Sequence, residues 1–186
     1  GIECKKSWKQ TKYIFFLALL RPNKGAHLLI EAVAKLKASL KGWKIVIAGK
    51  DNEHYASFLK KLIIQYQLED MISLPGALYG EDKWNMYRKA DFFVLPTLNE
   101  NFGIVIAEAL LCGTPVITCK GAPWNGLIDN HCGWWVDRTV EDITDALNKA
   151  IRLQENEIRE MGMRGREFVI NNYASNLVAK QLIDVY

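Results

Sequence analysis

The sequence predicts an α/β fold, namely a Rossmann-like, doubly wound parallel sheet of about six strands with helices on both faces. Short, continuous apolar runs such as Phe92–Leu95 alternate about six times with segments of helical periodicity. Runs without polar alternation are typical of strands that are covered on both faces of a parallel sheet. Glycine, proline and asparagine punctuate the junctions between the runs. A length of 186 residues fits one domain or one lobe of a larger protein.

The first half of the chain reads as alternating strands and helices after a mixed, polar segment that we assign to a linker, residues 1–12. Strands are expected at 13–19, 44–48 and 71–74, the last ended by Pro75-Gly76. Helices are expected at 26–40, 53–66 and 82–89. Apolar residues recur at helical spacing in the first two helices, with Phe58 counted among the apolar positions of the second.

The second half continues the alternation. Strands are expected at 91–95, 115–118 and 133–136, and a short apolar helix is expected after Gly103. Thr139 and Asp142 resemble a capping box at the start of a helix that runs to about residue 153. Further helices are expected at 155–172 and from Ser175 onward. We therefore assign 13–173 to one Rossmann-like lobe and 174–186 to a C-terminal helix.

Composition and charge narrow the class of protein. A net charge of +3 gives no indication of a nucleic-acid partner. A cluster of lysines, at positions 35, 37, 41 and 44, is either a solvated face or a peripheral contact with acidic lipid headgroups. The longest apolar run, 13–20, is too short to span a bilayer, which needs about 20 residues. The chain does not begin with methionine, so missing targeting signals say little.

Cysteine spacing favours a reducing environment. The four cysteines, Cys4, Cys112, Cys119 and Cys132, form no C-x-x-C pair. Cys112 lies in an apolar helix and Cys119 ends an apolar strand, so buried, reduced thiols are expected. An intracellular, cytoplasmic location follows as the expectation, with the inner face of the membrane as a further option.

The most informative stretch is 96–110, which follows the strand Phe92–Leu95. It turns at Gly103 into an apolar helix, with Glu100 in the turn and Glu108 two helical turns later. The first turn of a helix presents unpaired N–H groups and a partial positive charge. A strand, loop and helix start in this order therefore predict an anion site.

Common nucleotide and metal motifs are absent from the sequence. There is no G-x-G-x-x-G after the first strand and no G-x-x-x-x-G-K-[ST]. There is also no Asp-x-Asp, and the histidines at 27, 54 and 131 lack metal-ligand spacing. We therefore expect no metal and no cofactor.

A specific family resemblance remains. Glu100-x7-Glu108, with Asn101-Phe102-Gly103 inside it and Gly113–Ile117 after it, resembles the signature of retaining GT-B glycosyltransferases, and more narrowly glycosyltransferase family 4. Supporting matches run from about residue 13 to 173. They include Arg21-Pro22-Asn23-Lys24-Gly25, Ile47-Ala48-Gly49, Leu74-Pro75-Gly76 and Cys132–Val136. The resemblance covers the C-terminal lobe only, so a partner lobe that binds the acceptor is expected to be missing.

The resemblance implies a role for several residues toward a nucleotide-sugar donor. Glu100 would contact hydroxyls of the donor sugar as a charge-stabilising catalytic group, and Glu108 would bind the ribose hydroxyls. Lys24 would contact the diphosphate. The donor-binding residues implied in full are Arg21, Lys24, Gly49, Leu78, Asn101, Phe102, Gly103, Ile104 and Glu108. The alternatives are a solvated turn residue for Lys24 and a salt-bridged buried glutamate for Glu108.

The chain departs from the family pattern at two places. The family arginine five residues before Lys24 is Leu19 here, and Arg21 is the nearest arginine. On a strand a shift of two residues keeps the same face, so Arg21 either reaches the phosphates or merely caps the turn. Asn125-Gly126 replaces a glutamate often present in the family. Trp124 could serve as a sugar platform, whereas Trp134 and Trp135 are expected to anchor the core or a loop.

Three functions fit these observations. The leading one is the donor lobe of a retaining, metal-independent glycosyltransferase that builds cell-surface polysaccharide or glycolipid. An alternative is a GT-B relative that epimerises or phosphorylates sugars. A third is a degenerate lobe that binds no donor and serves as an interaction module.

Overall fold

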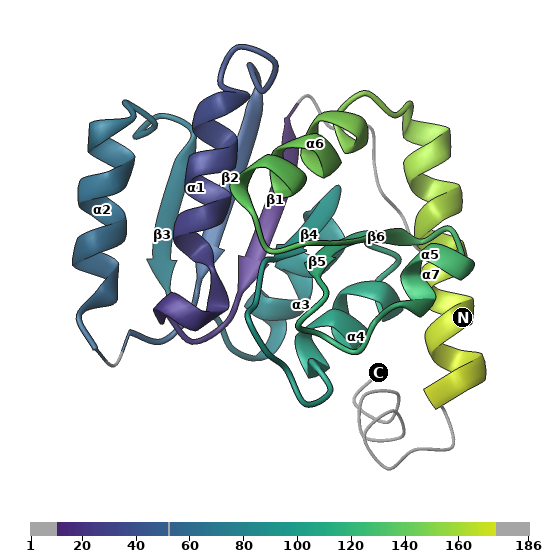
Figure 1. Ribbon diagram of the computed structural model, residues 1–186. Helices are drawn as coiled ribbons and strands as arrows, with labels where there is room; N and C mark the ends of the chain where they lie inside the picture. Colours follow the sequence, from purple (N-terminus) through teal and green to yellow (C-terminus); the bar gives the residue numbers. More distant parts are fainter. Residues whose placement is uncertain (1–10, 52, 174–186) are drawn as a thin grey trace.

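The structure is a computed structural model that describes residues 11–51 and 53–173 (Figure 1). It contains six parallel strands in the order β3-β2-β1-β4-β5-β6. The strands are β1 (Lys12–Leu17), β2 (Trp43–Ala48), β3 (Ile72–Gly76), β4 (Phe92–Leu95), β5 (Val116–Cys119) and β6 (Gly133–Val136). The predicted doubly wound parallel sheet is confirmed.

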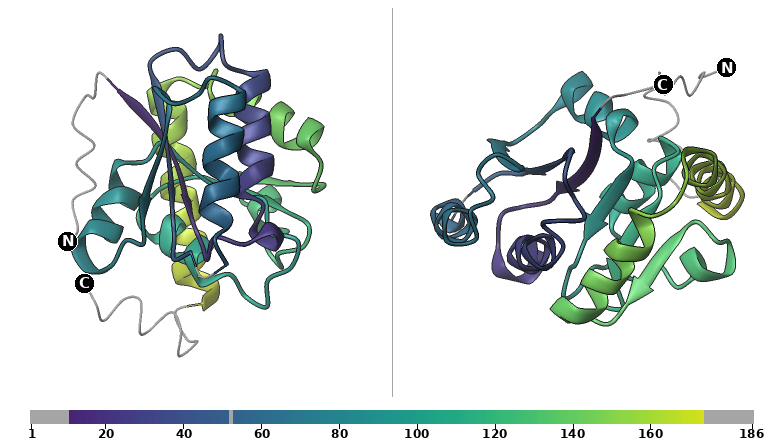
Figure 2. Two further views of the ribbon diagram at one scale, coloured as in Figure 1. Left: turned by 90° about the vertical axis from the view of Figure 1, so that its left-hand side faces the viewer. Right: turned by 90° about the horizontal axis from the view of Figure 1, so that it is seen from above.

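Helices cover both faces of the sheet (Figure 2). One face carries α1 (Ala26–Lys35), α2 (Tyr55–Gln65) and α6 (Val140–Ala150), with α1 packed between the other two. The opposite face carries α3 (Gly80–Lys89), α4 (Ile104–Leu111) and α7 (Glu155–Tyr173), with α4 against α7. Two short elements, the 3-10 helix η1 (Pro22–Lys24) and α5 (Gly126–Asp129), lie in loops.

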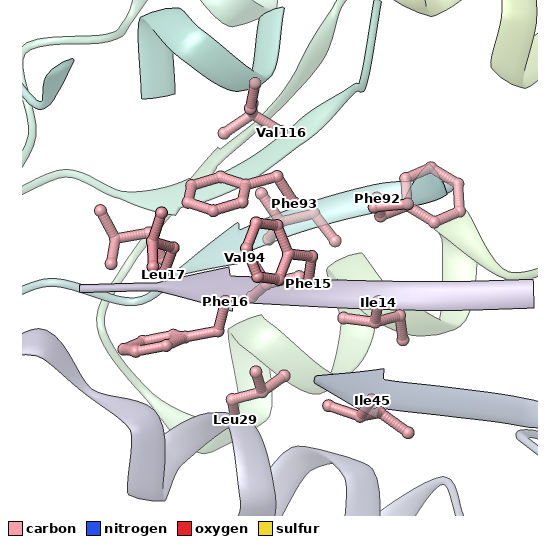
Figure 3. Packing of buried hydrophobic residues seen from close by; sticks show 14 of the residues in the cluster. Ile14, Phe15, Phe16, Leu17, Leu29, Ile45, Phe92, Phe93, Val94 and Val116 are labelled. Carbon is pink, nitrogen blue, oxygen red and sulfur yellow. The ribbon is translucent and has the colours of Figure 1, made fainter. Parts of the chain in front are cut away.

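The core is built on the central strands, whose side chains alternate between the two faces (Figure 3). Phe15 points to the α3 side, where its ring lies 5.1 Å from Tyr87 and 5.8 Å from Phe93, both edge-on. Phe16 points to the other side, toward Leu29 of α1. All of these side chains are buried, which explains why β1 and β4 read as continuous apolar runs.

Several predicted boundaries were wrong for identifiable reasons. The first strand ends at Leu17 rather than residue 19, and it begins at Lys12, one residue inside the predicted linker. The first helix ends at Lys35, because i→i+3 bonds such as Ser39 N–H to the Leu36 carbonyl tighten the chain into turns. Phe58 is exposed rather than packed. Residues 1–10 and the helix expected from 174 to 186 lie outside the described residues.

The prediction for Pro75 was wrong, whereas the prediction for Thr139 was confirmed. Pro75 was expected to end the third strand, but β3 runs on to Gly76. Because β3 lies at the edge of the sheet, a residue without an N–H is tolerated there. The Thr139 hydroxyl accepts a hydrogen bond from the Asp142 N–H at 3.0 Å, which confirms the predicted cap of α6.

Close backbone contact between α7 and the α4–β5 turn gives a stability prediction. A Cβ on Gly162 would lie 2.0 Å from the Gly113 carbonyl oxygen, so α7 would have to move. We expect Gly162→Ala to lower the free energy of unfolding by about 2 kcal/mol despite the better helix propensity of alanine. The control is Met163→Ala, which removes an exposed side chain one position further on. Urea unfolding measures both, and equal midpoints would contradict the close packing.

Candidate functional site

The candidate site lies where the chain leaves the two central strands. β1 and β4 are neighbours, paired from Ile14 with Phe92, but they lead into helices on opposite faces of the sheet. At such a switch point the loops diverge beyond the carboxyl ends of the strands, which is where open α/β sheets bind ligands. The two loops are 18–25, which includes η1, and 96–103.

Backbone contacts tie the two loops together. The Leu98 N–H donates to the Asn23 carbonyl at 2.7 Å. Gly25 adopts a left-handed conformation with φ of 79°, and a Cβ there would lie 2.1 Å from the Pro96 carbonyl oxygen. Only glycine satisfies both conditions, so the loops meet at a distance that no side chain permits.

Arg138, which follows β6, clamps the same two loops from outside. Its Nε donates to the Pro96 carbonyl at 2.9 Å and its Nη2 to the Pro22 carbonyl at 3.0 Å. Sequence reasoning missed this residue. Its acceptors are backbone carbonyls 42 and 116 residues away, and such contacts leave no mark on local sequence.

The two loops bring the predicted Lys24 and Glu100 together. Lys24 Nζ donates to Glu100 Oε1 at 2.6 Å, although the residues are 76 positions apart. Each side chain is less than one fifth exposed, at 18% and 17%. A glutamate and a lysine at the switch point therefore form one partly shielded ion pair, which presents charges of both signs to a ligand.

The predicted turn at Gly103 opens helix α4 as expected. Gly103 is the N-cap, in a left-handed conformation with φ of 79°, and Ile104 is the first helical residue. Among the described residues, the N–H groups of Phe102, Gly103 and Ile104 have no hydrogen-bond acceptor. Asn101 is exposed just before them. Together they form a run of available donors at the positive end of the helix dipole.

A buried tryptophan supports this turn from beneath. Trp124 is 1% exposed and its indole N–H donates to the Phe102 carbonyl. The prediction that it could be a sugar platform is therefore wrong, because a buried indole cannot face a ligand. Trp135 donates to the Ala122 carbonyl at 2.8 Å and Trp134 packs edge-on against Phe92. Both have the anchoring positions that were expected.

Glu108 occupies a different environment from Glu100. It lies four residues beyond Ile104, about 6 Å along the helix axis, and is 5% exposed. Lys83 Nζ donates to Oε1 at 2.7 Å and the Tyr87 hydroxyl donates to Oε2 at 2.9 Å. Glu108 is thus the salt-bridged buried glutamate that the sequence left as one alternative. Its partners, both on α3, were not predicted.

Arg21 is not directed at the Lys24–Glu100 pair. Its Nε lies 3.0 Å from Glu53 Oε1, in an exposed charge–charge contact without hydrogen-bond alignment. Leu19 and Arg21 also lie beyond the end of β1, so the argument that a two-residue shift keeps one strand face was wrong. Leu19 is 40% exposed, and Arg21 precedes η1 in the position that caps the turn.

The remaining predicted positions lie in the neighbouring loops. The Gly49 N–H donates to the Gly76 carbonyl at 2.8 Å, and a Cβ on Gly49 would lie 1.7 Å from the Ala18 carbonyl oxygen. Gly49 thus holds the ends of β1, β2 and β3 together. Leu78 is half-buried in the loop between β3 and α3.

A half-buried histidine–tyrosine pair lies beside Arg138. His27 Nδ1 and the Tyr55 hydroxyl share a hydrogen bond of 2.8 Å. Burial, helped by the charge of Arg138, lowers the pKa of His27, whereas burial raises the pKa of Tyr55 to about 12. Both groups are therefore neutral near pH 7, and the pair packs α1 against α2 rather than carrying charge to the site.

Other potential chemistry in the chain is limited. No group of three or more metal-ligating side chains occurs in the described part of the chain. No helix within residues 11–51 and 53–173 is long and apolar enough to cross a bilayer. Cys112, Cys119 and Cys132 are buried, as expected, and burial raises the pKa of Cys119 and Cys132 to about 12. Cys4 lies outside the described residues.

Fold and site together define a Rossmann-like α/β lobe with a turn of available N–H donors at its switch point. Residues 3–168 match the model of the family described as glycosyl transferases group 1, and the chain belongs to that family. The resemblance in the sequence is thereby confirmed.

Relatives and solved structures agree with this assignment. The putative colanic acid biosynthesis glycosyltransferase WcaL of Salmonella typhimurium is 28% identical over 89% of the chain, which spans only 42% of that protein. The C-terminal domain of a group 1 glycosyl transferase, LpcC of Francisella tularensis, has a TM-score of 0.76 and 25% identity, covering 88% of this chain and 87% of that one. The Anabaena protein Alr3699/HepE, solved with UDP and glucose, has a TM-score of 0.77 and 20% identity, covering 94% and 48% respectively.

The partners of Glu108 give a prediction about stability. Lys83→Ala leaves a buried carboxylate with one donor fewer, so we expect the free energy of unfolding to fall by about 2 kcal/mol. Lys35→Ala is the matched control, because Lys35 and Glu141 form a pair of 2.6 Å that is exposed to solvent and therefore contributes little to stability. Urea denaturation of both variants tests the difference. Equal losses would mean that burial of Glu108 carries no energetic weight.

Proposed function

We propose that this chain is the nucleotide-sugar-binding lobe of a retaining, metal-independent glycosyltransferase. The observation that carries the proposal is the Lys24–Glu100 ion pair at the switch point, which adjoins the loop of available N–H donors around Gly103. A nucleotide-sugar presents an anion and a set of hydroxyls within a few ångströms of each other. The pair offers a cation for the first and an acceptor for the second.

The diphosphate binds to the amides of Phe102, Gly103 and Ile104 and to Lys24 in this proposal. Transfer breaks the bond between the anomeric carbon and the phosphate oxygen, and the electron pair stays on the departing diphosphate. Fixed amide dipoles and an ammonium group stabilise the charge that develops there. These groups supply the compensating field that a divalent metal supplies in other enzymes, so no cofactor is required.

Glu100 acts on the sugar side as the catalytic carboxylate. Its Oε1 is held by Lys24 and its N–H donates to the Gly121 carbonyl at 2.9 Å, so the loop position is fixed. The carboxylate accepts hydrogen bonds from the donor sugar and stabilises positive charge on the ring. The acceptor hydroxyl attacks the same face that the diphosphate leaves and gives its proton to the departing phosphate oxygen, so the anomeric configuration is retained.

Glu108 binds the ribose hydroxyls after a change of partners. Each carboxylate oxygen accepts more than one hydrogen bond, so Tyr87 stays in place on Oε2. Lys83 is 23% exposed on its side chain and can withdraw from Oε1 to admit the ribose. Backbone groups near Gly49 and Leu78 contact the base, and the loop position of both residues agrees with that role.

The whole protein is proposed to carry a second lobe that binds the acceptor, because the chain spans 42% of the WcaL relative. The name of WcaL, which refers to colanic acid biosynthesis, supports a surface polysaccharide as the product. A cytoplasmic location at the inner face of the membrane remains a prediction. The lysine cluster adds little to it, since Lys35, Lys37 and Lys44 bond to groups within the chain.

One observation favours a second candidate, a degenerate lobe that binds no donor. Leu19 replaces the family arginine, and Arg21 is engaged with Glu53 instead of facing the site. Titration of UDP, GDP and ADP by calorimetry, with EDTA and without magnesium, decides between the two. Saturable binding of one nucleotide supports the proposal, and silence from all three with the chain folded supports the degenerate lobe.

The role of Lys24 gives a sharper prediction. Lys24→Ala should weaken the affinity for the nucleoside diphosphate that the wild-type chain binds by about 10- to 100-fold, because a charge-assisted contact is lost. The affinity for the nucleoside should be unchanged. The control is Lys120→Ala, which removes an exposed lysine paired with Asp137 at 2.8 Å. Calorimetry measures the affinity of each variant and of the wild-type chain for the diphosphate and for the nucleoside. Equal losses for diphosphate and nucleoside in Lys24→Ala would refute the assigned contact.

A further inference from the structure

We infer that Trp124 is a positioning residue for the diphosphate site, acting through the orientation of one peptide group. The inference rests on the proposed function, because it concerns the amides at the start of α4. Trp124 contacts no ligand itself, since its side chain is 1% exposed. Its contribution is a hydrogen bond from the indole N–H to the carbonyl of Phe102.

The peptide group that joins Phe102 to Gly103 links this hydrogen bond to the direction of the Gly103 N–H. The described residues contain no cis peptide bond, so the Phe102 carbonyl and the Gly103 N–H point in opposite directions. The carbonyl points at the buried indole, and the Gly103 N–H therefore points away from it. That N–H has no acceptor among the described residues, which leaves it available to an anion.

Gly103 itself requires such an external constraint. A glycine with φ of 79° has ready access to other backbone conformations, so the turn does not fix its own peptide plane. A Cβ at Gly103 would lie 3.3 Å from the indole nitrogen, which shows how closely the ring adjoins the turn. Without the indole donor the Phe102 carbonyl loses its buried partner, and rotation of the peptide costs less.

The indole is held by aromatic side chains from other elements. Ring centroids of Phe102 and Tyr173 lie 5.4 Å from that of Trp124, and Phe168 lies 6.1 Å away. Phe168 and Tyr173 belong to α7, so this helix braces the turn. The loop after β5 contributes twice, through Trp124 and through the Gly121 carbonyl that accepts from the Glu100 N–H. Donors fixed before the ligand arrives bind the developing charge without reorganisation.

The chain contains a matched control for the test. Trp135 also donates its indole N–H to a backbone carbonyl, that of Ala122, at 2.8 Å. Tryptophan-to-phenylalanine substitution at either position removes one such hydrogen bond and keeps an aromatic ring. The two carbonyls differ, because that of Ala122 also accepts the Trp124 N–H at 2.8 Å and keeps this bond without the Trp135 indole, whereas that of Phe102 shares its peptide with Gly103.

We expect Trp124→Phe to weaken the affinity for the diphosphate that binds best among UDP, GDP and ADP by about five- to tenfold. The affinity for the matching nucleoside should be unchanged. Trp124→Phe and Trp135→Phe should lower the urea midpoint by similar amounts. Trp135→Phe should leave the affinities for the diphosphate and for the nucleoside unchanged. In the wild-type chain the ¹⁵N–¹H signal of Gly103 should shift when the diphosphate binds, and this shift should shrink in Trp124→Phe.

The outcomes separate this inference from the proposed function. If the wild-type chain binds a diphosphate but Trp124→Phe and Trp135→Phe bind it equally well, Trp124 has only a structural role and the inference fails alone. If the folded wild-type chain binds none of the three diphosphates, the proposed function fails and takes the inference with it. Equal weakening of diphosphate and nucleoside in Trp124→Phe would also overturn the positioning role.

Discussion

The ion pair between Lys24 and Glu100 is the contact on which the candidate site depends. It joins two loops that leave adjacent strands toward opposite faces of the sheet, and each side chain is less than one fifth exposed. The loops cannot separate without breaking the contact of Gly25 with the Pro96 carbonyl and the double clamp of Arg138. The charged pair is therefore set by the backbone around it rather than by two flexible side chains meeting by chance. A pair held in this way loses little entropy on forming, unlike an exposed pair at the surface.

The two carboxylates of the family signature are held by different contacts. Glu100 lies in a loop with one cation, whereas Glu108 lies on a helix with both oxygens engaged by α3. A ligand that reaches Glu108 must take over a bond now made by Lys83, and it must compensate a nearly buried charge in doing so. The nucleoside end of a donor would therefore meet Glu108, which already accepts two hydrogen bonds. The sugar end would meet Glu100, which is partly exposed and has one cation beside it. Under the proposed function, contacts at Glu108 would be the more selective of the two, because a ligand without suitable hydroxyls would displace Lys83 without replacing its hydrogen bond.

The sequence predicted the fold from its apolar runs, because strands buried on both faces carry no polar alternation. It also predicted Lys24, Glu100, Gly103 and Glu108, since local motifs place each of them after a particular strand. It did not predict Arg138, Lys83 or the hydrogen bond of Trp124, which it interpreted as a possible sugar platform. Their contacts are made with backbone carbonyls or with side chains from distant elements, and the relevant geometry exists only once the sheet has formed. The error at Leu19 and Arg21 has a related origin, because strand periodicity was applied to residues that lie beyond the end of β1.

Pro75 on the outermost strand has a consequence for association between molecules. β3 forms one border of the sheet, and its pairing with β2 shifts register next to Pro75, between the partners Val46–Ser73 and Ala48–Gly76. A border strand that is bulged and interrupted by proline is a poor template for a strand from another chain. The border is thus protected against the growth of a continuous intermolecular sheet.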